Sequence, residues 1–178
     1  MNHCYAATLI QFIETDTDAI SDQFPPEDKV EWQKQIELLK LQCQQLPHLA
    51  GDIVLSFSSP TSEPAISAIV LYRGLVFVLG FGFESQTYQP AQLDALHNQA
   101  RMLKDQHIGS QAKFIIPVSI ETQAAPQGGA IHVSEDLVAD TMCDNGDHLA
   151  ALIEHFANQY KDDQIILSDW LASGFRPH

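Results

Sequence analysis

The sequence predicts a single α/β domain, residues 1–178, in which helices flank a mixed sheet. Two observations carry this prediction. Apolar, β-branched segments of strand length lie close together in the middle of the chain, and segments with apolar residues at three- and four-residue spacing precede and follow them. A length of 178 residues also fits one domain with a substantial core.

The first long helix is predicted over residues 28–46. Asp28 and Glu31 lie near its start, where carboxylates suit the helix dipole, and Pro47 ends it. One face is apolar and carries Trp32, Ile36, Leu39, Cys43 and Leu46.

Three strands are predicted next, over residues 53–57, 65–72 and 75–83. The second and third are joined at Arg73–Gly74, a spacing typical of a tight hairpin. Both are almost entirely apolar, which indicates a sheet that is covered on its two faces.

A second helix is predicted over residues 90–106, with Pro90 at its first position. Its buried stripe is expected to hold Leu93, Leu96, Ala100, Leu103 and Ile108. A strand over 113–120 follows, and Pro117 within it indicates either a position away from the sheet centre or a bulge.

The remainder is predicted to be rich in helix. Residues 121–130 form a loop, and a helix over 147–160 follows. A short strand over 164–167 leads to a final turn that Ser168 caps. The helix over 147–160 buries Leu149, Leu152, Ile153 and Phe156. The core order is therefore α-β-β-β-α-β with an α-rich tail.

The charge balance is strongly acidic. Nine Lys and Arg oppose 23 Asp and Glu, giving a net charge of −14. Because proteins gain affinity for nucleic acids by neutralising phosphates with cations, direct nucleic-acid binding is not expected without a local basic patch or a bound metal. The acidity fits two interpretations: it keeps the protein in solution, or it forms a face for a basic partner.

The sequence favours a cytoplasmic protein. The chain has no apolar run of the roughly 18 residues that a membrane span needs, and its first residues have no basic segment of a secretory signal. Cys4, Cys43 and Cys143 are far apart and odd in number, which favours reduced structural thiols over disulfides or a zinc site.

Several stretches carry a resemblance to a known family, in order and over nearly the whole chain. They are YAATLIQFIETD, WQKQIELLK, FSSP, AISAIVLYRGLVFVLGFGFES, LDALHNQARMLKDQHIGSQAK, FIIPVSIET and DWLASGFRP. Together they resemble the PD-(D/E)XK nuclease-like module of Schlafen-type DNA/RNA helicases, the family that contains domain of unknown function 2075. The resemblance implies a restriction-endonuclease-like αβββαβ core. It leaves open whether the chain is a stand-alone module or part of a helicase.

In that family an aspartate and a glutamate hold a divalent cation, and a lysine lies beside the scissile phosphate. A hard cation needs such carboxylates, and it lowers the pKa of the attacking water. The matching positions here are Ser67, Gly80 and Gly82, so all three expected side chains are missing. We therefore expect no catalytic residue, no cofactor and no bound metal at these positions.

A relocated nuclease site is the alternative. Glu84 together with Asp94, Lys104 and His107 of the second helix are its candidates, with Mg²⁺ as the metal. The same three helix residues also suit the helix dipole without any catalytic role. Gly80 and Gly82 either reflect drift after catalysis was lost or allow another element or a ligand to approach closely.

These expectations favour a non-catalytic module that binds a protein partner. The partner is either a helicase-type nucleic-acid enzyme, with a defence system as one context, or a second copy of the chain itself. An acidic mimic of DNA is a variant of this hypothesis. The divergent metal-dependent nuclease is its alternative.

Overall fold

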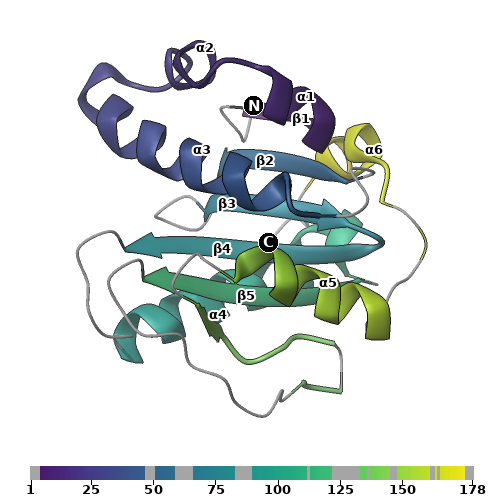
Figure 1. Cartoon of the computed structure of the whole chain (residues 1–178). Coiled ribbons are helices and arrows are strands. Elements are labelled where there is room, and N and C mark those ends of the chain that lie inside the picture. Colours follow the sequence, from purple (N-terminus) through teal and green to yellow (C-terminus); the bar gives the residue numbers. More distant parts are fainter. Residues whose placement is uncertain are drawn as a thin grey trace.

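The computed structural model describes residues 5–46, 51–58, 66–82, 90–111, 113–121, 133–135, 137–144, 148–160, 163 and 165–174. Within them a six-stranded mixed sheet has the order β1-β2-β3-β4-β5-β6 (Figure 1). Pairing is antiparallel from β1 to β4 and parallel from β4 to β6. The strands are β1 (Tyr5–Thr8), β2 (Asp52–Phe57), β3 (Ile66–Tyr72), β4 (Leu75–Gly82), β5 (Phe114–Glu121) and β6 (Met142–Asp144).

Helices flank this sheet on both faces, which confirms the predicted mixed α/β fold. The helices are α1 (Leu9–Glu14), α2 (Thr17–Ser21), α3 (Lys29–Cys43), α4 (Pro90–Gln106), α5 (Leu149–Tyr160) and α6 (Leu167–Ala172), with 3-10 turns η1 (Pro26–Asp28) and η2 (Ile108–Ser110). The segment from α3 to β5 has the predicted order α-β-β-β-α-β. No helix among the described residues is long and apolar enough to cross a membrane.

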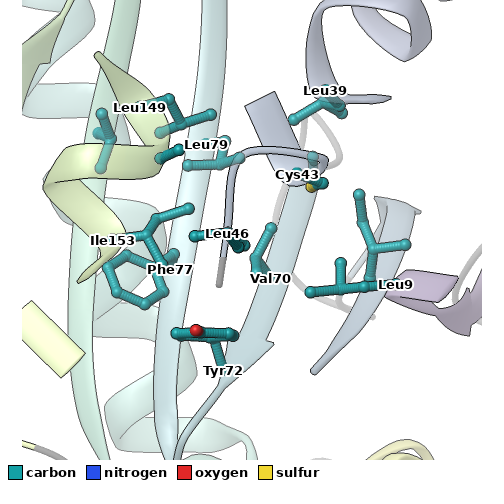
Figure 2. Packing of buried hydrophobic residues seen from close by; sticks show 14 of the residues in the cluster. Leu9, Leu39, Cys43, Leu46, Val70, Tyr72, Phe77, Leu79, Leu149 and Ile153 are labelled. Carbon is teal, nitrogen blue, oxygen red and sulfur yellow. The ribbon is translucent and has the colours of Figure 1, made fainter. Parts of the chain in front are cut away.

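Alternate residues of the central strands serve two separate hydrophobic clusters. Leu75, Phe77 and Leu79 of β4 pack in the cluster that contains α1, α3 and α5. Val76 and Val78 pack in the cluster that contains α4 and α6. Figure 2 shows the first cluster, where residues of α3 and α5 lie over β3 and β4. Because both faces are covered, the apolar strands predicted from sequence have no solvent-facing side.

Strand β5 contains Pro117 at a position where the pairing with the neighbouring segment, residues 138–142, is irregular. The amide of Ile115 donates to the carbonyl of Leu137 at 2.9 Å, and by alternation the Pro117 nitrogen faces the same side. Four residue steps separate Val138 from Met142, but only three separate their partners Ile115 and Val118. The extra residue makes a bulge in the outer segment. Strand β5 is internal in the sheet. Pro117, which has no N–H to donate, lies where the pairing of β5 with that segment is interrupted.

Three sequence predictions for the end of α4 and for the last helix are wrong, and a fourth concerns residue 121. Residues 165 and 166 belong to no strand, and α6 begins at Leu167 with Ile166 as its N-cap, so Ser168 lies inside the first turn. A short apolar run does not distinguish a strand from a buried helical turn, and here the burial of Trp170 decides for the helix. Ile108 is 49% exposed and does not extend the buried stripe of α4, because the chain turns into η2.

Glu121 was placed in a loop, but it is the last residue of β5 and is buried. The other residues of that predicted loop lie outside the described residues, as do Pro47 and Asp147. The short elements β1, α1, α2 and β6 were not predicted, because four to six residues show no clear periodicity.

The hairpin at Arg73–Gly74 is confirmed and yields a test. Both residues have positive φ, 50° for Arg73 and 84° for Gly74, as a two-residue type I′ turn requires. Arginine tolerates this conformation poorly, whereas asparagine favours it. We expect Arg73→Asn to raise the free energy of unfolding by about 0.5–1 kcal/mol in urea denaturation. Gly74→Ala should lower it, and a stabilising Gly74→Ala would contradict this account of the turn.

Candidate functional site

The three positions that match the nuclease residues lie on one face of the sheet. Gly80 and Gly82 follow Val76 and Val78 at two-residue spacing on β4, so they share the face that α4 covers. On β3, Ser67 alternates with Ile69 and Leu71 of the same cluster. The pairing of Ala68 with Leu79 places Ser67 next to Gly80. The fold therefore brings these three positions together.

A side chain from α4 fills the space next to Gly80. A Cβ atom at Gly80 would lie 2.8 Å and 2.9 Å from the two terminal methyl carbons of Leu96. Leu96 is itself buried. At this position a carboxylate would have to displace Leu96 and lose its hydration, which is costly without a compensating partner. Of the two interpretations of the glycines, close approach of another element fits Gly80, where the element is a helix of the same chain.

Strand β5 adds two polar residues to this face that sequence reasoning missed. Ser119 pairs with Gly80 and Glu121 pairs with Gly82, and both side chains are fully buried. The hydroxyl of Ser119 donates to Oε1 of Glu121 at 3.2 Å, while Oε2 has no hydrogen-bond partner among the described residues. Burial raises the pKa of Glu121, and the Ser119 hydrogen bond opposes this shift. The sequence signal for them is the alternation of two polar residues, Ser119 and Glu121, at the end of an otherwise apolar strand.

Strand β6 completes the face with a thiol. Cys143 pairs with Ser119, and its pKa is raised by burial and by the nearby charge of Glu121. The thiol is therefore protonated at neutral pH and is a poor nucleophile or metal ligand. Among the described residues, no group of three or more His, Cys, Asp or Glu side chains is placed to hold a metal ion.

The helix candidates for a relocated site do not converge. Asp94 is exposed near the start of α4. Lys104 lies ten residues later, about 15 Å along the helix at 1.5 Å per residue. Its Nζ donates to the carbonyl of Lys113 at 2.7 Å, just before β5 begins. Lys104 and His107 thus lie at the end of α4 remote from Leu96 and the glycines. Glu84 lies outside the described residues.

His107 belongs to a different buried group. Its Nδ1 lies 2.9 Å from the hydroxyl of Ser110, and its Nε2 lies 3.4 Å from the hydroxyl of Ser173. Its ring packs on Trp170 at a centroid distance of 4.3 Å. Burial lowers the pKa of His107 to about 4, so the imidazole is neutral near pH 7. Nothing in the sequence indicates that residues 107 and 173 lie together.

The contact between Gly80 and Leu96 can be tested with a double-mutant cycle. Gly80→Ala should lower the free energy of unfolding by about 1–3 kcal/mol, because the new methyl group crowds Leu96. Leu96→Ala should lower it by about 2–5 kcal/mol through the cavity it leaves. The double variant should lose less than both single variants together, as read from chemical denaturation. Strict additivity would show that the two residues do not compete for one space.

The buried carboxyl of Glu121 predicts a dependence of stability on pH. Burial raises the pKa of Glu121 in the folded state above its value in the unfolded chain. The protonated carboxyl therefore contributes to the free energy of unfolding below the unfolded-state pKa, and this contribution is lost as pH rises through the folded-state pKa. We expect Glu121→Gln to unfold at higher denaturant concentration than the wild type at pH 7, with the difference shrinking towards pH 4. The exposed Glu135→Gln is the matched control and should show no such trend. A constant difference across this range would remove the titration of Glu121 as its cause.

Comparison with known proteins yields no relative. No family model matches this chain, and no curated protein or solved structure shows a significant match to it. The resemblance to the helicase-linked nuclease module therefore stays a prediction from sequence. The geometry of the described residues is what bears on function.

Proposed function

We propose that this chain is a catalytically inactive nuclease-fold module that binds a protein partner and regulates a nucleic-acid enzyme. The single observation that carries the loss of catalysis is the Leu96 side chain packed against Gly80. An apolar group occupies the space that a metal-binding carboxylate would need. The missing side chains at Ser67 and Gly82 support the same conclusion.

The restriction-endonuclease-like core belongs to this proposal. The observed order α3-β2-β3-β4-α4-β5, with β4 and β5 parallel, fits an αβββαβ core. The three emptied positions gather on one face of adjacent strands, as residues descended from one active site would. The remaining strands and α-helices extend that core: β1, α1 and α2 precede it in the chain, β6, α5 and α6 follow it, and β1 and β6 lie at the two edges of the sheet.

A protein is the favoured partner because of the charge. With a net charge of −14, the chain as a whole repels a phosphate backbone. A basic surface of a helicase-type enzyme would instead be attracted, and this attraction would weaken with salt. Self-association is the other form of the proposal, and mimicry of DNA is a special case of binding to a basic protein.

The divergent nuclease remains a second candidate because of one observation. Oε2 of Glu121 is buried, lacks a partner among the described residues and lies on the strand position next to Gly82. A carboxylate there could replace one lost metal ligand, with Glu84 as a second. Lys104 and His107 have no part in such a site, because they lie at the opposite end of α4.

The two candidates are separated by cleavage and metal-binding measurements on the intact chain. We expect no cleavage of single- or double-stranded DNA or of RNA with Mg²⁺ or Mn²⁺, and no Mn²⁺ binding in calorimetry. Combining Ser67→Asp, Gly80→Glu, Gly82→Lys and Leu96→Ala supplies the ligands and the space, so this variant should gain Mn²⁺ binding. The same variant with Leu96 retained is the matched control and should bind less well.

Cleavage by the wild type that Glu121→Gln or Glu84→Ala abolishes would overturn the proposal in favour of the nuclease. Partner binding is tested separately, by light scattering for self-association and by titration with a purified helicase-type partner at several salt concentrations. A monomer that binds no such protein at low salt would remove the interaction role, even if the chain has no catalytic activity.

A further inference from the structure

The outer edge of β1 offers backbone hydrogen-bonding groups to a further strand. Among the described strands β1 lies outermost, next to β2 (Figure 1). The amide of Leu9, just after β1, donates to the carbonyl of Gly51 at 2.9 Å. In the antiparallel register this pairing recurs at every second residue of β1. The intervening residues, Ala6 and Thr8, therefore turn their backbone groups away from β2.

These outward groups have no partner in the described part of the chain. No hydrogen bond joins the N–H or C=O of Ala6, or the N–H of Thr8, to another described residue. The carbonyl of Thr8 belongs to the first turn of α1, which Thr8 caps. An added strand can therefore accept hydrogen bonds from two amides of β1 and donate one to a carbonyl.

Strand β1 lacks most of the features by which proteins protect a sheet edge. Its residues, Tyr5–Thr8, include no charged side chain and no proline, and their register with β2 is regular. The opposite edge differs, because residues 138–142 contain a bulge. With four residues, however, β1 is short. Backbone pairing alone gives little affinity there, so an added strand needs a side-chain anchor.

A buried carboxylate directly behind this edge can supply the anchor. Asp52, the first residue of β2, is the cross-strand partner of Thr8 and is 8% exposed. Its side chain has no hydrogen bond or ion pair with any described residue. Burial raises the pKa of Asp52, whereas a neighbouring cation would lower it. Because an unpaired buried carboxylate is costly, we look for its partner outside the chain.

Asp52 and the outward residues of β1 share one face of the sheet. Asp52 alternates with Val54, and both Val54 and Ala6 pack in or against the cluster that contains α4 and α6. Neighbouring strands lie about 5 Å apart, so a strand added to β1 would lie about 10 Å from β2. The side chains of Ala6 and Thr8 between them are short. A lysine or arginine on the added strand, together with the Asp52 side chain, spans this distance.

We propose that the edge of β1 binds an extended segment of a partner protein as an additional strand, and that a lysine or arginine of this segment pairs with Asp52. This inference rests on the proposed function, because it names the place and the chemistry of partner binding. Backbone hydrogen bonds to Ala6 and Thr8 give the segment its register, and the ion pair selects a basic residue. The net charge of −14 favours a basic segment over a second copy of the same acidic chain.

The test selects peptides of strand length from a random-sequence library on the immobilised full chain. The selected peptides should be rich in lysine or arginine, and their binding should weaken with salt. Asp52→Asn keeps the size of the side chain and removes its charge, so it should weaken binding at least about tenfold. Ala6→Pro removes an outward N–H, which an edge strand tolerates, and should abolish binding. Glu135→Gln removes an exposed acid near the opposite edge and is the matched control, with unchanged affinity.

Hydrogen exchange locates the bound peptide on the wild-type chain. Binding should slow exchange at the amides of Ala6 and Thr8, which point outward. The amide of Ala7 should change little, because it already pairs with β2. This measurement decides the question even if one of the variants does not fold.

Four results would overturn the edge site. They are failure to select any peptide, selected peptides without basic residues, binding that Asp52→Asn and Ala6→Pro leave unchanged, and exchange at Ala6 and Thr8 that the peptide does not slow. A wild-type dimer that Ala6→Pro dissociates would also overturn it, because a second copy would then occupy the edge.

Failure of the edge site and failure of the proposed function give different results. A helicase-type enzyme that binds Ala6→Pro as tightly as the wild type removes the edge site and leaves the proposed function in place. If basic peptides bind at Ala6 and Asp52 but no such enzyme binds the chain, the edge site stands and the proposed role with that enzyme falls.

Discussion

Strand β4 pairs with β3 in the antiparallel sense and with β5 in the parallel sense, and the rest of the structure depends on this double pairing. A parallel partner needs a crossover connection, and α4 provides it. The crossover places α4 over one face of the sheet, and α1, α3 and α5 cover the other. Every residue from Leu75 to Gly80 is consequently buried, whichever face it points to.

The same crossover determines the state of the candidate site. Because α4 runs from the carboxyl end of β4 towards the start of β5, its early turns bring Leu96 against Gly80. Leu96 fits there only because Gly80 has no side chain. The absence of a side chain at Gly80 and the packing of the helix against it are thus one structural fact. What is left on this face is a carboxyl group, Glu121, with a raised pKa and half of its hydrogen-bonding capacity unused among the described residues.

The two ends of α4 differ in character. One end closes an apolar contact over the emptied site. The other carries Lys104 and His107, whose polar atoms are satisfied by the carbonyl of Lys113 and by serine hydroxyls. Burial lowers the pKa of His107, so its imidazole is neutral near pH 7. Helix α4 thus makes an apolar contact with the sheet at one end and joins a buried polar cluster at the other.

The sequence by itself determined the long elements. The apolar stripe over 28–46 and the pair of apolar strands around Arg73–Gly74 are periodic over enough residues to identify their type, and both faces of β4 had to be buried because neither is polar. Through a resemblance it also singled out three positions, Ser67, Gly80 and Gly82. Only the tertiary structure decided which residues lie beside them. That Leu96 fills the space at Gly80, that Glu121 ends a strand beside Gly82 and that His107 meets Ser173 are contacts between residues 16 to 66 positions apart. Local periodicity contains no information about such pairs. The helix at 167–172 was missed for the same reason, since the burial of Trp170 against Phe57 and His107, and not its own six residues, stabilises it.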